Sequence, residues 1–101
     1  MKSEKPLGLF CYHDGIAAEV YSICRQYKLK IPQEVGVVGF DDLPIAGMMS
    51  PKLTTIAYRY DVMAETAVDT LLDIINHKDI KEKKQSVRPV LTVRDSNVAV
   101  N

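Results

Sequence analysis

Residues 35–42 constrain the fold more than any other part of the chain. Their sequence, VGVVGFDD, is a run of six residues almost without polar side chains that leads into two adjacent carboxylates. Such a run predicts a parallel strand that is buried on both faces and whose carboxyl end opens onto solvent. Because α/β proteins bind ligands beyond the carboxyl ends of their strands, Asp41 and Asp42 are the first candidates for a binding site.

The preceding residues complete a β-α-β unit. A short apolar run at residues 7–12 predicts a first strand, which ends at His13. Residues 16–27 have apolar side chains at three- and four-residue steps and predict an amphipathic helix, with Asp14 as its N-cap. A crossover of this length is almost always right-handed, so we expect His13 and Asp41 at one edge of the sheet.

The rest of the chain predicts further elements of the same kind. Alternating β-branched residues favour a third strand at 53–58, and a broad apolar stripe predicts a second helix from about Asp61. A last strand is expected at 87–94, followed by a frayed tail at 95–101.

An irregular apolar segment between Pro44 and Pro51 predicts at most one helical turn. It carries two adjacent methionines, Met48 and Met49. Two interpretations are equally favoured: the segment covers a ligand cleft or a partner subunit, or it packs on its own core.

Composition narrows the class of protein. With 101 residues, 13 basic and 13 acidic side chains, the chain predicts one small domain without bulk attraction to nucleic acid or membranes. Cys11 and Cys24 lack metal or redox spacing, and no stretch approaches a signal peptide or a membrane span, so we expect buried thiols and a cytoplasmic location. The mixed charge run at 77–85 is expected to be a surface turn.

Neither catalysis nor a metal site is favoured by the motifs. No nucleophile elbow and no glycine-rich phosphate loop is found, so we expect no cofactor. Asp41 and Asp42 resemble the carboxylates of phosphoacceptor domains, but a third acidic partner is missing, and we expect no metal. A histidine and an aspartate at strand ends can instead bind sugar hydroxyl groups. Asp41 is the better candidate, and Asp42 is expected to cap local backbone amides in a turn.

Three ordered motifs resemble the carboxyl-terminal part of the LacI/GalR family of bacterial regulators. They are FCYHDGIA at 10–17, IPQEVGVVGFDD at 31–42 and SPKLTTI at 50–56, and the resemblance extends from about residue 7 to 96. It implies an α/β fold: a Rossmann-like three-layer unit with a mostly parallel sheet, part of a periplasmic-binding-protein-like (type I) fold. It also implies that 6–52 and 86–96 form the carboxyl-terminal subdomain, whereas 53–77 belongs to the amino-terminal one.

The resemblance also implies roles for single residues. Asp41 corresponds to an aspartate that contacts the effector, and His13 stands where many members have an asparagine that faces the ligand. Tyr12 replaces a residue that is commonly small and would narrow the cleft. The expected dimer interface contains Ala18, Met48 and Met49.

The function implied is that of a non-enzymatic regulator. A small sugar-like effector would control DNA affinity, a homodimer is expected, and DNA would be contacted only through a helix-turn-helix domain absent from this chain. Because such a fragment has unpaired strand edges, two copies are expected to pair, and exchange of residues 53–77 between them is one hypothesis. The alternatives are a fragment of a periplasmic-type sugar-binding protein, and a phosphoacceptor or metal-dependent enzyme that uses Asp41 and Asp42.

Overall fold

The chain divides into two compact units. The computed structural model describes residues 6–80 and 84–97. Unit 1 comprises Met1–Ala57 and Leu91–Asn101, and unit 2 comprises Tyr58–Val90. The first division therefore follows Ala57, later in the chain than the boundary expected after residue 52. The assignment of the units to the two subdomains of the LacI/GalR fold stays a prediction.

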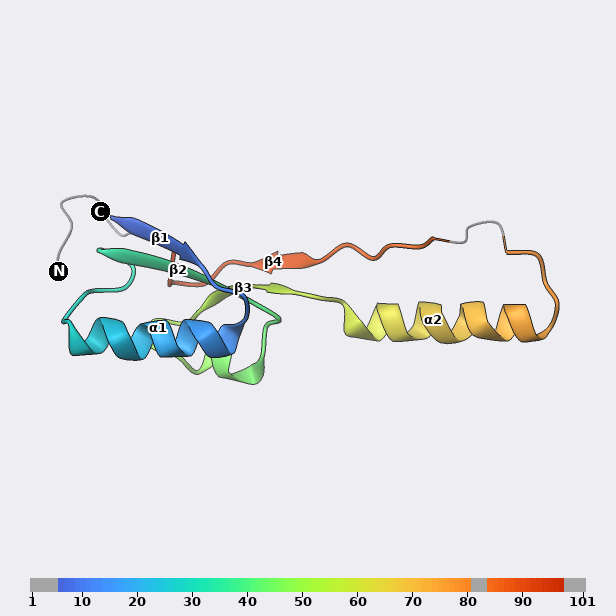
Figure 1. Cartoon of the computed structure of the whole chain (residues 1–101), viewed down its shortest axis with the longest axis horizontal. Coiled ribbons are helices and arrows are strands. Elements are labelled where there is room, and N and C mark those ends of the chain that lie inside the picture. Colours follow the sequence, from blue (N-terminus) through green and yellow to red (C-terminus); the bar gives the residue numbers. More distant parts are fainter. Residues whose placement is uncertain (1–5, 81–83, 98–101) are drawn as a thin grey trace. The chain divides into compact units, whose positions relative to one another are not determined.

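An open sheet forms the centre of unit 1. Its strands are β1 (Leu7–Phe10), β2 (Val35–Phe40), β3 (Thr54–Ala57) and β4 (Val90–Thr92), in the spatial order β1-β2-β3-β4 (Figure 1). β1 and β3 both pair with β2 in parallel, with Leu7 opposite Val35 and Val38 opposite Thr54. The predicted strands and the mostly parallel α/β class are confirmed.

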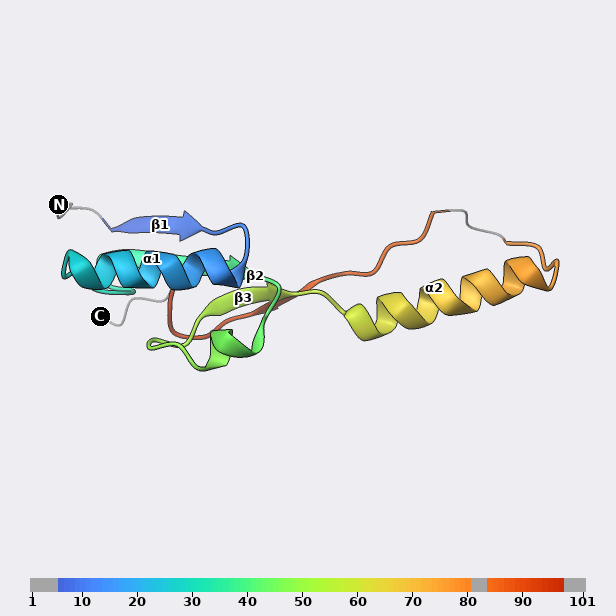
Figure 2. The same cartoon turned by 60° about the horizontal axis from the view of Figure 1, so that its bottom comes forward.

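Helix α1 (Asp14–Gln26) covers one face of this sheet (Figures 1 and 2). Its buried side chains meet every second residue of β2, as period-2 alternation requires for a strand with one face on the core. The short helix η1 (Pro44–Gly47), which is the single predicted turn, adds Ala46 to the same core. The buried apolar residues are Cys11, Ala17, Tyr21, Cys24, Val35, Val37, Ala46 and Leu53.

The prediction that β2 is buried on both faces is wrong, because the opposite face of the sheet is open in the described part of unit 1. Phe10 is 68% exposed, and its ring stacks on Phe40 with a centroid distance of 6.5 Å. A hollow of about 480 Å³ runs along β1 and is lined by Gly36 and Val38 of β2. A three-layer fold would cover this face with a further layer. The described residues of unit 1 place no helix on it.

Two local predictions are wrong. The N-cap of α1 is His13, and Asp14 is the first residue of the helix, with a side chain that is fully buried. The tail is anchored at least as far as Asn97. Ser96 is fully buried and bonds to both Thr54 and Val37, and Asn97 accepts a hydrogen bond from the Thr54 hydroxyl at 2.6 Å. Residues 98–101 lie outside the described part.

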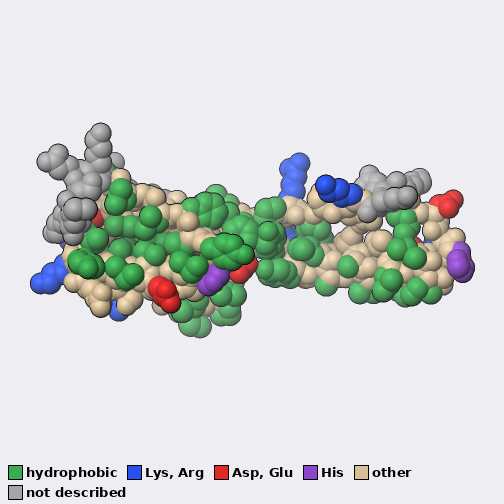
Figure 3. Space-filling view, viewed as in Figure 1, with side chains coloured by type: hydrophobic (Ala, Val, Ile, Leu, Met, Phe, Trp, Pro, Cys, Tyr) green, Lys and Arg blue, Asp and Glu red, His purple; other side chains and the backbone are tan. Residues whose placement is uncertain are grey.

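Unit 2 is built on helix α2 (Tyr60–Ile75), which begins one residue before the predicted start. No residue of α2 is buried, and its apolar side chains are open to solvent. Hydrophobic side chains are accordingly prominent on the visible surface (Figure 3). A hollow of about 440 Å³ lies between α2 and the segment at Gln85 and Val87. In the charge run, Lys78, Asp79 and Lys84 are exposed as expected, and residues 81–83 are outside the description.

Candidate functional site

The predicted ligand residues follow β1 and β2. Because these neighbouring strands are parallel, Tyr12 and His13 lie at the same edge of the sheet as Asp41. The Tyr12 side chain is 84% exposed and packs edge-on against the His13 ring, with 5.8 Å between centroids. His13 and Asp41 are half-buried. This edge of the sheet therefore carries a solvent-exposed aromatic ring, an imidazole and a carboxylate.

The loop that carries Asp41 is held through three successive backbone N–H groups. Asp41 donates to the carbonyl of Ile56 at 2.8 Å. Asp42 donates to the Thr55 hydroxyl at 3.3 Å, and Leu43 donates to a carboxylate oxygen of Asp14 at 2.7 Å. Since two of the partners lie in β3 and the third lies at the start of α1, the loop has little freedom to shift along its length.

The same loop has a strained backbone. Asp41 has φ 104° and Asp42 has φ 54°, both in the left-handed region that non-glycine residues rarely adopt. Residues in such conformations each cost on the order of 1–3 kcal/mol and persist only where the surroundings hold them. Strain of this kind concentrates at ligand-binding sites, which supports a functional interpretation of the loop.

Asp14 is the buried support of this loop, and sequence reasoning missed that role. Its second carboxylate oxygen accepts the Thr55 hydroxyl at 2.6 Å, and both side chains are fully buried. Its position at the first turn of α1 stabilises the negative charge through the helix dipole. Gly39 leaves the necessary room, since a Cβ there would collide with the Asp14 carboxylate.

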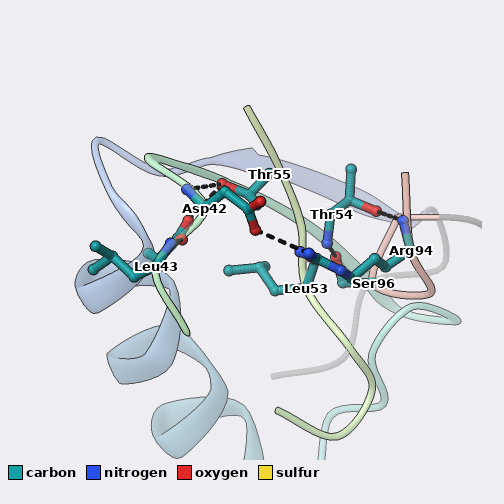
Figure 4. Close-up of polar contacts among 8 residues, drawn as sticks. Asp42, Leu43, Leu53, Thr54, Thr55, Arg94 and Ser96 are labelled. Atoms are coloured by element: carbon teal, nitrogen blue, oxygen red, sulfur yellow. Dashed lines mark hydrogen bonds and ion pairs between the residues drawn. The ribbon is translucent and has the colours of Figure 1, made fainter. Parts of the chain in front are cut away.

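Asp42 forms an ion pair, whereas the sequence predicts that it caps local backbone amides. Its Oδ1 lies 2.9 Å from Nη2 of Arg94, and the two side chains are 28% and 23% exposed (Figure 4). The other terminal nitrogen of Arg94 donates to the Leu53 carbonyl at 2.8 Å. A partly buried, charge-assisted contact of this geometry is stronger than an ordinary surface ion pair.

His13 has one nitrogen committed to the fold. Its Nδ1 accepts hydrogen bonds from the backbone N–H groups of Gly15 at 3.0 Å and Ile16 at 3.3 Å, which caps α1. An Nδ1 that accepts carries no proton, so the neutral ring has its hydrogen on Nε2. His13 is therefore a hydrogen-bond donor toward any further partner, as the amide of an asparagine would be.

Other chemistry at this edge is limited. Burial, and then the charge of Asp14, raise the pKa of the Cys11 thiol, which keeps it protonated and unreactive. Within the described ranges, no group of three or more His, Cys, Asp or Glu side chains is placed to hold a metal ion. What the arrangement offers is hydrogen bonding: a carboxylate acceptor and an imidazole donor.

The three expected interface residues differ in exposure. Met48 is 78% exposed, Ala18 is half-buried, and Met49 packs partly against the core of unit 1. Met49 therefore packs on the core of its own unit, which is one of the two interpretations of the methionine segment, whereas Met48 remains open. Whether these residues meet a second copy stays a prediction.

Comparison with known proteins gives a consistent set of relatives. Residues 1–97 match the family described as periplasmic binding protein-like domain. The chain is 34% identical over 92 residues to the ribose operon repressor of Escherichia coli (strain K12), covering 91% of this chain and 28% of the repressor. The chain thus spans less than a third of that relative. No helix in the described ranges is long and apolar enough to cross a membrane.

Solved structures agree with this match. A periplasmic binding protein/LacI transcriptional regulator from Alkaliphilus metalliredigens QYMF, complexed with D-xylulofuranose, has a TM-score of 0.80 at 30% identity, covering 91% of this chain and 35% of that one. The lac repressor dimer bound to operator and the anti-inducer ONPF has a TM-score of 0.83 at 25% identity, with coverages of 91% and 32%.

Proposed function

The chain belongs to the family of periplasmic binding protein-like domains, and we propose that it is the effector-binding and dimerisation portion of a LacI-type transcriptional regulator. The observation that carries the proposal is the strained, fully anchored loop at Asp41, beside His13 at the carboxyl edge of parallel strands. No catalytic step is included. In the longer protein, occupancy of this site would be linked to DNA affinity, and the effector would act in the cytoplasm.

The proposed ligand is a small sugar, with a pentose as the first choice. The carboxylate of Asp41 accepts hydrogen bonds from ligand hydroxyl groups, and Nε2–H of His13 donates to a ligand oxygen. The exposed ring of Tyr12 offers an apolar surface for the carbon skeleton of the sugar. Two relatives support a pentose, since one represses a ribose operon and another is complexed with D-xylulofuranose.

The proposed dimer uses Ala18, Met48 and Met49. The exposed side chain of Met48 would gain most from cover by a second copy, because Met49 already packs partly on its own unit. The lac repressor structure, which is described as a dimer, supports this assembly. Residues 58–77 of unit 2 would belong to the element, residues 53–77, that the resemblance assigns to the amino-terminal subdomain.

Titration calorimetry of the chain with D-ribose and D-xylulose tests the ligand proposal. We expect one of these sugars to bind, and we expect Asp41→Asn to weaken binding by about tenfold or more, since a hydrogen bond to a charged group contributes about 1.5–3 kcal/mol. Asp79→Asn, which changes an exposed carboxylate of unit 2, is the matched control. Binding of neither sugar, or equal affinities for the two variants, would contradict the proposal.

A further inference from the structure

Arg94 holds the binding loop from a distant part of the chain. It follows β4, and its guanidinium contacts two groups at once: the Asp42 carboxylate at 2.9 Å and the Leu53 carbonyl at 2.8 Å (Figure 4). Its own backbone N–H donates to the Thr54 hydroxyl at 2.7 Å. The guanidinium is planar and rigid, and the backbone of Arg94 is also held by a hydrogen bond. Arg94 is therefore a fixed point to which Asp42 is bound.

Asp42 needs such a fixed point. Its φ of 54° lies in the left-handed region, which few residues other than glycine adopt and which costs free energy that the surroundings have to offset. Its backbone N–H has only a long hydrogen bond, 3.3 Å to Thr55, whereas its side chain has the short contact with Arg94. The ion pair is therefore the stronger restraint on this residue.

The conformation of Asp42 sets the orientation of Asp41. The two residues share a peptide bond, and Asp41 is itself at φ 104°. If Asp42 returned to a negative φ, the shared peptide would rotate and the Asp41 carboxylate would turn with it. Asp41 is thus oriented through its neighbour as well as by its own hydrogen bond to Ile56.

We propose that Arg94 is a positioning residue of the effector site, which acts through Asp42 to aim the carboxylate of Asp41 at the ligand. The inference rests on the proposed function, because Asp41 is the group that meets the sugar. Arg94 itself does not contact the ligand. An arginine is required because a lysine ammonium cannot present two donors in a fixed plane to a carboxylate and a carbonyl.

The test compares glycine and alanine at position 42 in the Arg94→Met background of the full chain. Arg94→Met weakens D-ribose binding about tenfold. Arg94→Met/Asp42→Gly restores most of the affinity, because glycine adopts a positive φ unaided. Arg94→Met/Asp42→Ala does not restore it, although it removes the same unpaired carboxylate. Equal affinities of the two double variants would overturn the proposal and leave Arg94 a purely structural role.

Two further measurements test the proposal if Arg94→Met does not fold or if the chain does not bind either sugar. If Arg94→Met does not fold, the single variants Asp42→Gly and Asp42→Ala make the same comparison, and equal affinities again overturn the proposal. If the unmodified chain binds neither D-ribose nor D-xylulose, the proposed function fails separately. The one-bond Cα–Hα coupling of residue 42, which differs between positive and negative φ, is then measured. It changes in the folded Arg94→Met or Asp42→Ala variant if the proposal holds, and an unchanged coupling overturns the proposal.

Discussion

Tyr21 joins α1 to the chain segment beyond η1. Its side chain is 7% exposed, and its hydroxyl donates to the Pro51 carbonyl at 2.8 Å. Burial is the main cause that raises the pKa of Tyr21 to about 12. An unfolded tyrosine ionises near pH 10, so above that pH the unfolded state loses this proton first, and the free energy of unfolding falls as the pH approaches 12.

We expect Tyr21→Phe to lower the free energy of unfolding at pH 7 by about 1 kcal/mol, through loss of the hydrogen bond. Above pH 10 the variant should lose stability less steeply than the unmodified chain. Urea unfolding at pH 7, 9 and 11 measures both effects. Tyr27→Phe is the control, because Tyr27 is 61% exposed. Identical pH slopes for the two variants would show that Tyr21 ionises as freely in the folded state as in the unfolded state.

Single residues differ in how far the sequence predicts their roles. Asp41 was identified because a carboxylate after an apolar strand has a local signature. The role of Asp14 was not predictable in this way, because its partners Leu43 and Thr55 are 29 and 41 residues away. Arg94 is 52 residues from Asp42, and nothing in the pattern of a last strand indicates such a pair. Polar contacts between distant segments require the tertiary structure.

At the scale of elements, the start of α1 serves both the fold and the proposed site. His13 accepts the first helical N–H groups on one ring nitrogen and leaves the other to donate. The helix itself was predictable from its apolar period, whereas the cap was assigned one residue too late. Sequence preference favours aspartate as a cap, but here Asp14 is drawn into the buried contact with Thr55.

Three substitutions at His13 separate its two roles. We expect His13→Ala to lower the free energy of unfolding by about 1 kcal/mol, whereas His13→Asn and His13→Asp retain stability because both residues cap helices well. Only asparagine also keeps an outward donor, so His13→Asn should bind D-ribose more tightly than His13→Asp. Thermal unfolding and calorimetry of the same samples measure the two effects. If the two capping variants bind the sugar equally, His13 acts as a cap and not as a ligand contact.

At the scale of the whole molecule, many large apolar side chains remain exposed in both units. The sequence indicated this, since the resemblance covers only part of a longer fold, and the matched region is 28% of one relative and 35% of another. It could not indicate that Thr54–Ala57 stays with the sheet of unit 1, because a β-branched run carries no information about which strand it pairs with.

The exposed methionine segment predicts self-association. Light scattering across a concentration series should show a dimer, and Met48→Asp should shift it toward monomer because a buried carboxylate without a partner is unfavourable in an interface. Val93→Asp is the matched control, since Val93 is also exposed in unit 1 but lies outside the expected interface. A monomer at every concentration, or equal dissociation of both variants, would count against the proposed dimer.

The proposed function requires that a small sugar binds at the edge formed by His13 and the loop from Asp41 to Leu43. The most direct measurement is a backbone amide NMR titration of the chain with D-ribose and D-xylulose. We expect the largest shift changes at His13 and at Asp41–Leu43, with the amides of α2 nearly unchanged. Shift changes that spare this edge and gather on another surface, or no change with either sugar, would contradict the claim.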